Sequence, residues 1–506
     1  MSRVTTRDTV PTDRLEAILT PKDGVVLERP AVEKGMFEAA GGPFETYRRT
    51  VTVTGNDDGT SHVEQVVEFT LALLWFSWIV TPLFRAHLRK LEEPASPPWW
   101  APVDRIDRPA ARSLGSLGSM AVVIGYTLFL LPQTITFAAQ QFGANKASQS
   151  NALASTRADI VFVILLVALA DRRGRHRLLL ISTGGSAVLS AAGAFAPSLP
   201  WLAATQVGAS GFGSAAVVLI AIMAAETMPR SSRAYSLSLL TVAGSIGSGG
   251  VLGLLFIADF SRGSWRVLYA IGLLGLPLVI GIGRRLPESP RYLAPHAESP
   301  IAGHGRRLWL LAAAGLLINL FIAPSSEFLN DFLRHERHYD AASISLFVAV
   351  TSLPGGIGLM LGGRRAETRG RRMVAVVGLL GGVGITVVEF LTRGGLMWVA
   401  SAVSTMFAAA IVPAFGIYGP ELFPTGLRGQ ANALIQGASR VGSVVGLLMV
   451  GRLADHLGSY GPAMAIVALG PLGLIVLILV AFPETANQEL EDLNPEDRGE
   501  PRDEPS

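Results

Sequence analysis

Residues 167–180 read VALADRRGRHRLLL, and residues 362–375 read GGRRAETRGRRMVA. Each stretch places an acid and several arginines between two apolar runs. Three pairs of residues in the two stretches share one offset of 196 positions (367 − 171): Asp171 and Glu367, Gly174 and Gly370, Arg175 and Arg371. A short charged motif thus occurs twice at a fixed spacing, which predicts a duplicated chain.

The composition indicates a membrane protein. Of the 506 residues, 50% are hydrophobic and only 16% are charged, whereas soluble domains carry about 25% charged residues. Cysteine is absent, which excludes disulfides, a thiolate nucleophile and Cys-ligated metal sites. The first thirty residues contain no apolar segment, so we expect no cleavable signal peptide. The net charge of only +3 does not indicate a nucleic-acid partner.

Apolar runs long enough to cross a bilayer follow residue 112. A bilayer core takes about 20 apolar residues of helix, and spans must be helical because lipid satisfies no backbone hydrogen bonds. We predict twelve spans: 113–138, 151–170, 178–197, 201–225, 234–258, 265–283, 308–329, 341–362, 373–392, 396–418, 430–451 and 461–482.

Basic residues are divided unequally between the two sets of loops. The set that includes both quoted stretches holds 17 Lys and Arg residues, and the opposite set holds seven. Because Lys and Arg are enriched in cytoplasmic loops, the first set is predicted to be cytoplasmic. An even number of spans then places both termini in the cytoplasm of a multi-pass protein of the cell membrane. The acidic tail after Pro483 is expected to be solvated and disordered.

Two further motifs are duplicated. Pro287-Glu288 matches Pro483-Glu484, and the segment 226–229 matches 421–424 with an offset of 195 (421 − 226). We therefore predict an all-α membrane protein with two pseudo-symmetric six-helix bundles. Such parallel repeats suit alternating access, with substrate held between the halves near the midplane. The predicted parts are an N-terminal extension (1–112), the first bundle (113–283), a cytoplasmic linker (284–307), the second bundle (308–482) and the tail (483–506).

The box Asp171-Arg-Arg-Gly-Arg175, repeated with Glu367 as its acid, resembles the signature loop of the major facilitator superfamily, and the resemblance covers roughly 113–485. Trp265-Arg266, PESPRYL at 287–293, PELFPTGLRG at 420–429 and PET at 483–485 resemble the sugar-porter-related branch, which includes organic-anion and aromatic-acid proton symporters. The resemblance implies a secondary transporter and not an enzyme. It also implies a gating loop in each half, formed by Asp171, Arg172, Gly174, Arg175, Gly363, Glu367, Gly370 and Arg371.

The chain departs from the pattern of this family at two places. Val167 stands in the first copy of the loop where Gly363 stands in the second, and Gln206 lies near the position of the usual arginine of span four. The missing arginine argues against a mechanism like that of the sugar porters.

Three ionisable residues lie inside the predicted spans: Arg157 and Asp159 in span two, and Arg440 in span eleven. A charge in the bilayer is costly unless it faces a cavity or a partner, so each is a candidate for function. A guanidinium can bind a carboxylate through two parallel hydrogen bonds. We therefore predict that both arginines contact an anionic substrate, the alternative being that they pair with neighbouring helices. Asp159 is predicted either to carry the transported proton or to act as a fixed counter-ion.

Other polar residues inside the spans are candidates for the cavity lining: Tyr126, Gln133 and Asn319. Glu327 and Glu389 lie near the outer ends of spans seven and nine, where we expect them to be solvated. The eight histidines show no metal-ligand spacing, so no metal site is predicted.

The N-terminal extension contains a strand pattern and an apolar run. Residues 47–54 and 62–71 alternate on either side of NDDG, which predicts a β-hairpin. Val63, Val67, Phe69 and Leu71 would share one face of it. The apolar run 69–84, followed by Arg85, Arg89 and Lys90, is expected to form a helix on the membrane surface. A thirteenth span is the alternative.

These features together predict a secondary active transporter that moves a small organic anion with protons by alternating access. The predicted partners are a small-molecule substrate, protons and the lipid bilayer, with no nucleic acid and no cofactor, and the chain is expected to act as a monomer. Two alternatives remain: a drug or metabolite efflux antiporter, and a non-transporting membrane sensor that uses residues 1–112.

Overall fold

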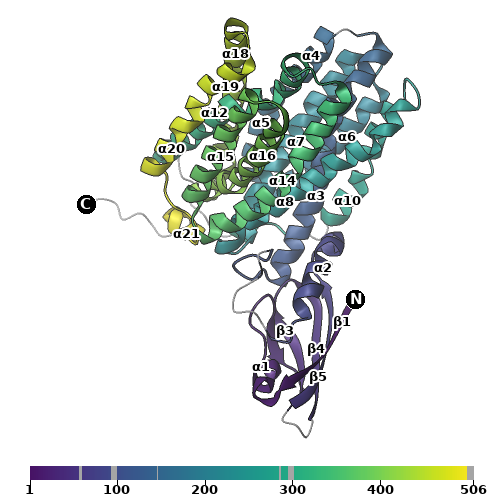
Figure 1. Ribbon diagram of the computed structural model, residues 1–506, viewed down its shortest axis with the longest axis vertical. Coiled ribbons are helices and arrows are strands. Elements are labelled where there is room, and N and C mark those ends of the chain that lie inside the picture. Colours follow the sequence, from purple (N-terminus) through teal and green to yellow (C-terminus); the bar gives the residue numbers. More distant parts are fainter. Residues whose placement is uncertain are drawn as a thin grey trace. The chain divides into compact units, whose positions relative to one another are not determined.

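The computed structural model describes residues 1–55, 60–92, 98, 100–144, 146–283, 286–293 and 301–498. It divides into two compact units (Figure 1). The N-terminal unit comprises Met1–Leu117 together with Thr227–Ser232, and the helical unit comprises Gly118–Glu226 and Arg233–Ser506.

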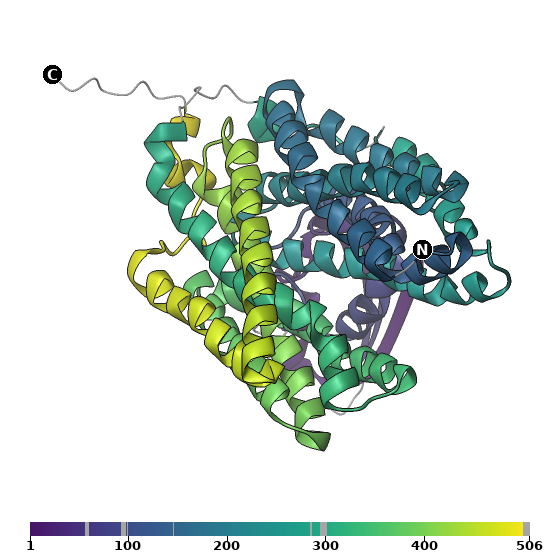
Figure 2. The same cartoon turned by 90° about the horizontal axis from the view of Figure 1, so that it is seen from above.

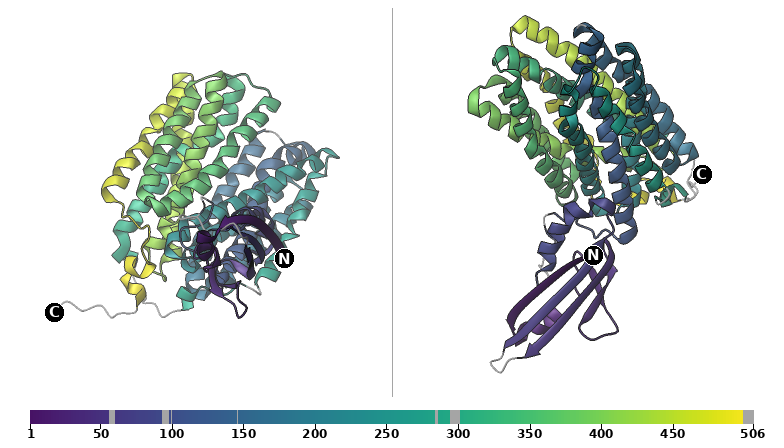
Figure 3. Two further views of the ribbon diagram at one scale, coloured as in Figure 1. Left: turned by 60° about the horizontal axis from the view of Figure 1, so that its bottom comes forward. Right: turned by 90° about the vertical axis from the view of Figure 1, so that its right-hand side faces the viewer.

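The N-terminal unit is built on an antiparallel sheet, drawn in purple in Figure 3. The sheet has five strands in the order β1-β5-β4-β3-β2. The predicted hairpin is confirmed as β4 and β5, with Tyr47 opposite Phe69 and Val53 opposite Val63. Its turn, residues 56–59, lies outside the described residues. The three other strands were not predicted. The elements are β1 (Ser2–Pro11), η1 (Thr12–Arg14), α1 (Leu15–Leu19), β2 (Leu27–Pro30), β3 (Met36–Gly41), β4 (Phe44–Gly55) and β5 (Thr60–Leu71).

One face of the sheet forms the core of this unit. Val63, Val67, Phe69 and Leu71 are all buried, as the alternation predicted. The same face of β4 carries a buried charge, because Arg49, which lies opposite Val67, pairs with Glu28 at 2.7 Å and both side chains are inaccessible to solvent. Arg49 also donates to the carbonyl oxygens of Ile18 and Thr20, so its guanidinium is well satisfied.

The apolar run 69–84 does not form one helix. β5 continues to Leu71, a short η2 (Leu74–Phe76) follows, and α2 spans Ser77–Leu88. Since α2 has only 12 residues and a span needs about 20, the alternative of a thirteenth span is wrong. Phe84 and Leu88 pack on the sheet, whereas Trp78 is 68% exposed.

The helical unit confirms the twelve predicted spans, because twelve helices among the described residues are long and apolar enough to cross a membrane. The longer helices are α3 (Arg108–Phe142), α4 (Lys146–Ser155), α5 (Ile160–Arg173), α6 (Arg175–Ala192), α7 (Leu199–Thr227), α8 (Arg233–Leu254), α9 (Trp265–Gly272), α10 (Gly275–Gly283), α12 (Gly305–Glu327), α14 (Ala341–Thr368), α15 (Arg371–Leu391), α16 (Gly394–Gly416), α18 (Arg428–Leu457), α19 (Tyr460–Val467) and α20 (Leu469–Ala481).

Short elements interrupt or connect these helices. They are η3 (Thr156–Asp159), η4 (Gly193–Phe195), η5 (Arg230–Ser232), η6 (Leu255–Asp259), α11 (Pro290–Leu293), η7 (Ile301–His304), α13 (Leu329–Asp331), η8 (Phe332–Glu336), α17 (Tyr418–Leu422), α21 (Leu490–Leu493) and η9 (Pro495–Arg498). We call α3 to α11 the first half and α12 to α20 the second half. Seen from above, the blue and teal helices of the first half lie beside the green and yellow helices of the second (Figure 2).

Glycines permit close helix packing in both halves. A Cβ built at Gly442 of α18 would lie 2.8 Å from the Cα of Leu316 on α12. Because small residues let backbones approach in a membrane protein, the high glycine content serves the packing of these helices.

Candidate functional site

A cavity of about 480 Å³ lies between the two halves of the helical unit. Its lining is mostly apolar, and α3 contributes Ile124, Leu128 and Phe129. The polar lining residues are all uncharged: Thr241, Ser245 and Ser248 on α8, and Asn432 and Gln436 on α18. This cavity can therefore hold a largely apolar molecule that makes a few hydrogen bonds.

Arg440 extends the polar face of α18 beyond the cavity. Asn432, Gln436 and Arg440 recur every four residues, so they lie on one side of the helix. Arg440 is roughly 6 Å further along the axis than Gln436, at 1.5 Å per residue. Its Nη2 donates to Asp159 Oδ2 at 2.6 Å, and the Arg440 side chain is 36% exposed. The cavity is thus neutral, with an accessible guanidinium about one helical turn away.

Asp159 lies where span two is interrupted, in η3 between α4 and α5. Its side chain is only 4% exposed, and Ser214 of α7 also donates to Oδ2, at 2.8 Å. Oδ1 is buried and has no hydrogen-bond partner among the described residues. The carboxyl group therefore joins three spans and keeps one oxygen available to a proton.

Arg157, two residues before Asp159, reaches a different partner. Its Nη2 lies 2.6 Å from Glu327 Oε1 on α12, and both side chains are partly exposed. The structure thus pairs each in-span arginine with a carboxylate of the opposite half. Neither arginine is among the residues that line the cavity.

The remaining predicted lining residues lie outside the cavity wall. Tyr126 donates through its hydroxyl to the carbonyl oxygen of Leu268, and Asn319 donates to Gly315 in its own helix. Gln133 is half-buried on α3. The expectation that Glu389 is solvated was wrong, because it is 4% exposed; it lies within the last turn of α15 but faces the protein.

At the end of the bundle that carries both copies of the duplicated loop, which we call the arginine-rich end, each half caps a helix of the other. Asp171 accepts from the backbone N–H of Gly429 at 3.2 Å and of Gln430 at 3.0 Å, at the start of α18. Glu367 accepts from Ala234 N at 2.5 Å, at the start of α8. The first N–H groups of a helix have no partner within it and carry partial positive charge, so carboxylates stabilise them.

Buried arginines repeat the same symmetry. Glu226 pairs with Arg175 of its own half and with Arg428 of the other. Glu421 pairs with Arg371 of its own half and with Arg233 of the other, the latter at 3.4 Å. All of these side chains are inaccessible to solvent. Ion pairs as well as helix caps therefore join the halves at this end.

The loop glycines are required by geometry. Gly174 and Gly370 have φ values of 100° and 93°, which residues with a Cβ rarely adopt. A Cβ at Gly174 would also lie 2.7 Å from the carboxylate of Glu288, which accepts from the backbone N–H of His176. Glu484 makes the equivalent contact with Arg372 N at 3.2 Å and also accepts from Arg371 N at 2.9 Å.

The two copies of the loop differ in packing. A Cβ at Gly363 would lie 3.0 Å from the carbonyl oxygen of Ala234, so this glycine lets α14 approach α8 closely. Val167 at the matching position of the first half is fully buried. Arg172 is exposed at the surface of the first loop.

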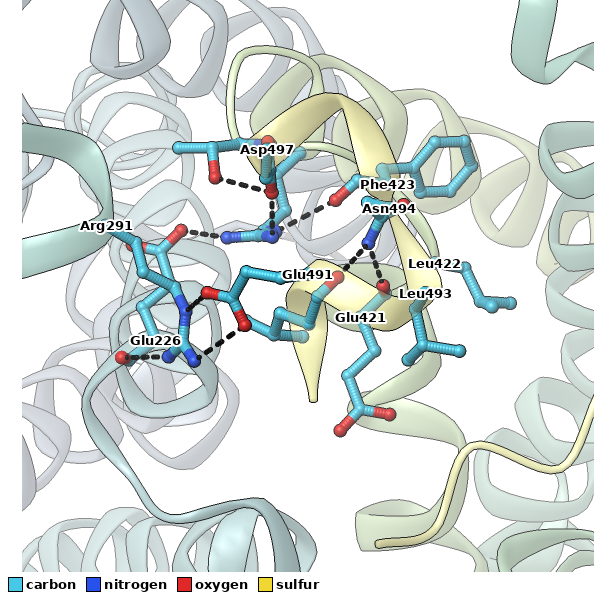
Figure 4. Close-up of polar contacts among 12 residues, drawn as sticks. Glu226, Arg291, Glu421, Leu422, Phe423, Glu491, Leu493, Asn494 and Asp497 are labelled. Carbon is cyan, nitrogen blue, oxygen red and sulfur yellow. Dashed lines mark hydrogen bonds and ion pairs between the residues drawn. The ribbon is translucent and has the colours of Figure 1, made fainter. Parts of the chain in front are cut away.

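The C-terminal tail was expected to be solvated and disordered, and this was wrong for its described part, 484–498. Asn494 is fully buried and donates to the carbonyl oxygen of Glu421 at 2.7 Å (Figure 4). Arg307 donates to Asn494 Oδ1 and to the carbonyl oxygen of Leu493. The tail is therefore anchored on the second half.

The same tail also reaches the first half. Arg291 donates through Nε to Glu491 at 2.8 Å and through Nη1 to the carbonyl oxygen of Glu226 (Figure 4). Burial raises the pKa of Glu491, but hydrogen bonds from Arg291 and from its own backbone, together with the charges of Arg291 and Arg233, lower it overall. Asp497 accepts from the backbone N–H of Thr425 at 2.9 Å. The tail thus bridges both halves at the arginine-rich end.

Some of these residues were missed by the sequence analysis. Glu226 and Glu421 were noted as part of a repeat but not as partners of the buried arginines. Their occurrence at an offset of 195, one less than that of the loop, was the available signal. The four-residue spacing of Asn432, Gln436 and Arg440 was a second signal that could have indicated a polar helix face.

The sequence model of the Major Facilitator Superfamily matches residues 115–328 and 326–503, so the chain belongs to this superfamily of membrane transporters. It is a transporter and not an enzyme. The chain is 26% identical to the gallate transporter of Pseudomonas putida over 372 residues, which cover 62% of this chain and 81% of that protein.

Solved structures show the same fold. The proton:xylose symporter XylE aligns with a TM-score of 0.63 at 16% identity, covering 76% of this chain and 99% of that one. The human organic anion transporter MFSD10 aligns with a TM-score of 0.58 at 15% identity, covering 72% and 99%. The chain is thus a multi-pass membrane protein with the fold of secondary transporters.

Proposed function

We propose that this transporter moves a small, largely apolar organic anion together with a proton. The observation that carries the proposal is the ion pair between Arg440 and Asp159, beside a cavity whose lining residues are uncharged. The cavity would take the apolar body of the substrate, and Arg440 would take its anionic group. The similarity to a gallate transporter supports an organic acid as substrate.

The proton and the anion would use the two partners of one ion pair. A proton that adds to Asp159 neutralises the carboxylate and weakens its bond to Arg440. The released guanidinium then binds the substrate anion through charge-assisted hydrogen bonds. Loss of the proton restores the Asp159–Arg440 pair and displaces the anion. One anion and one proton cross together in this cycle, so transport would be electroneutral.

The arginine-rich end would be the cytoplasmic gate, with both termini in the cytoplasm of a monomeric protein of the cell membrane. Its excess of basic loop residues supports this orientation. Opening this end requires loss of both inter-half helix caps, at Asp171 and Glu367, and of the ion pairs around Glu226 and Glu421. In the proposed cycle these contacts would hold this end closed.

Proteoliposomes test the proposal. Uptake of radiolabelled aromatic and aliphatic carboxylates should rise when the side of entry is acidic, and it should not respond to membrane potential. Arg440→Ala should abolish saturable binding, and Asp159→Asn should keep binding but lose the response to the pH gradient. Arg452→Ala is the matched control, since it removes an exposed arginine from the same helix, α18. Equal uptake by Arg440→Ala and Arg452→Ala would refute the role of Arg440.

A second candidate is export of an apolar compound. It is favoured because none of the described residues that line the cavity is charged. Thermal-shift measurements with carboxylates and with uncharged or cationic amphiphiles separate the two. Stabilisation by carboxylates that Arg440→Ala removes supports the organic anion, and stabilisation by amphiphiles alone supports export.

A further inference from the structure

The N-terminal unit includes a short segment from the connection between two spans. Thr227–Ser232, which joins α7 to α8, belongs to the same compact unit as Met1–Leu117. A domain that only tethered a soluble partner would need no contact with this loop. The contacts within the unit therefore indicate a role in the membrane-spanning part of the chain.

Asp104 makes the decisive contacts with this loop. Its Oδ2 accepts from the backbone N–H of Ser231 at 3.2 Å, and its carbonyl oxygen accepts from Ser232 Oγ at 2.8 Å. Ser231 and Ser232 are both buried. Two hydrogen bonds thus fix the last two residues of the loop to a single residue that precedes span one.

Asp104 is itself held by the sheet. The neighbouring Arg105 donates twice to Asp23 Oδ1, at 3.0 and 2.8 Å. At the start of α3, four and eight residues after Asp104, Arg108 and Arg112 both pair with Glu45 of β4. Hydrogen bonds from Arg112 and Arg108 lower the pKa of Glu45, which keeps it ionised. The sheet therefore restrains the segment that carries Asp104.

The loop leads directly into the charged network of the arginine-rich end. Glu226 precedes Thr227 and Arg233 follows Ser232, so each is one peptide bond from the restrained loop. Glu226 pairs with Arg428 of the second half, and Arg233 pairs with Glu421. A shift of Ser231 and Ser232 acts directly on Arg233, which follows them in the chain, and reaches Glu226 through the four intervening residues, 227–230.

We infer that the N-terminal unit braces the loop between α7 and α8 through Asp104, and that this brace holds Glu226 and Arg233 in place to bridge the two halves. Asp104 is a positioning residue of the gate and contacts no substrate. The inference rests on the proposed gate at the arginine-rich end. Release of the brace favours the state in which that end is open.

Distance measurements across the arginine-rich end test the brace without substrate or proton gradient. The chain has no cysteine, so Leu293→Cys and Thr368→Cys introduce one spin label in each half. Both positions are exposed. Pulsed electron spin resonance of the full chain in lipid nanodiscs then measures the distance between the two labels. The ratio of long to short distances gives the ratio of molecules open at this end to molecules closed there. Loss of one hydrogen bond of about 1 kcal/mol corresponds to a roughly five-fold rise in this ratio.

We expect Asp104→Ala to raise the ratio about five-fold on this scale, and Ser232→Ala to raise it independently. Asp104→Asn should retain the wild-type ratio, because its amide oxygen still accepts from Ser231 N. Asp107→Ala removes the same charge from the same segment and is the control. Thermal unfolding midpoints confirm that each variant is folded.

The brace is overturned if Asp104→Ala leaves the ratio unchanged, or if Asp107→Ala or Asp104→Asn raises it equally. Asp171→Ala separates this outcome from failure of the gate itself. If Asp171→Ala raises the ratio while Asp104→Ala does not, the brace alone fails. If neither changes it, the proposed gate fails as well.

Discussion

Substitution of Gly429 tests the helix cap that Asp171 provides across the two halves. A Cβ at Gly429 would lie 2.5 Å from Asp171 Oδ2 and 2.7 Å from Oδ1, well inside the roughly 3.5 Å at which nonbonded atoms attract each other. In Gly429→Ala the carboxylate must therefore move away from the start of α18. Both of its hydrogen bonds, to Gly429 N and Gln430 N, are weakened or lost.

The magnitude follows from the value of a helix cap. Loss of an N-terminal cap costs about 0.5 to 2 kcal/mol, and the cap exists only while the arginine-rich end is closed. The open state should therefore gain about 2- to 30-fold in relative population. Alanine also favours the helix over glycine by up to about 1 kcal/mol, but α18 is helical in both states, so this gain cancels.

Alkylation of a cysteine in the cavity measures this population. Ser245 lines the cavity, and Ser245→Cys would be the only thiol of the chain. A bulky, membrane-impermeant maleimide applied from the arginine-rich side should react faster in Gly429→Ala by the same factor. Gly384→Ala in α15 is the matched control, because a Cβ there meets no atom of the described residues within 4 Å.

Two results would refute this reasoning. One is an alkylation rate that is unchanged in Gly429→Ala or raised equally in Gly384→Ala. The other is full additivity with Asp171→Ala, because a methyl group that acts through the Asp171 carboxylate has no further effect once that carboxylate is removed.

Three other predictions concern the N-terminal unit and the tail. Arg49→Met leaves the buried Glu28 without its ion-pair partner and should destabilise the sheet by about 3 to 5 kcal/mol. Amide hydrogen exchange throughout β4 and β5 should then be faster than in the wild type. Faster exchange at the strand ends alone would contradict this. The pKa of Glu45 is lowered in the folded protein. Its contribution to the free energy of unfolding, under about 1 kcal/mol for an exposed pair, is therefore present above its usual pKa of 4.5 and is lost as pH falls through the lowered value. Glu45→Gln should remove this pH dependence from urea unfolding of the unit. Asp497→Ala removes the bond to Thr425 N and should speed maleimide access from the arginine-rich side, whereas unchanged access would show that the tail does not hold this end closed.

The features of the fold that depend on local sequence could be predicted. Spans follow from runs of apolar residues, and the β4–β5 hairpin follows from alternation on either side of a turn. The pairing of β1 with β5 joins Ser2 to Phe69, and no local pattern specifies such a distant partner. The tail was mispredicted because its acidic composition suggested solvation, whereas buried and half-buried arginines provide partners for its carboxylates.

The candidate site was predictable as a set of residues but not as a set of pairs. The cost of a charge in the bilayer singled out Arg157, Asp159 and Arg440. Their partners depend on how α5, α12 and α18 pack, since Asp159 and Arg440 are 281 residues apart. Glu389 could not be placed from the sequence for a similar reason. Neighbouring positions of a helix face different directions, so the packing of α15 decides whether a carboxylate near its end faces solvent or protein.

Two carboxylates of span two, Asp159 in η3 and Asp171 in α5, hold this span against α18. Asp171 holds the start of α18, and Asp159 holds Arg440 roughly 18 Å away, since twelve residues of helix separate the two acids. If a proton releases Asp159 while Asp171 stays bound, the helices can separate only on the side away from the arginine-rich end. Opening of the arginine-rich end instead requires the Asp171 cap to break, and that cap does not involve the proton. The two contacts therefore allow the halves to separate at only one end at a time. The proton controls the Asp159–Arg440 contact, and the network at the arginine-rich end, which the N-terminal unit and the tail hold, controls the Asp171 contact.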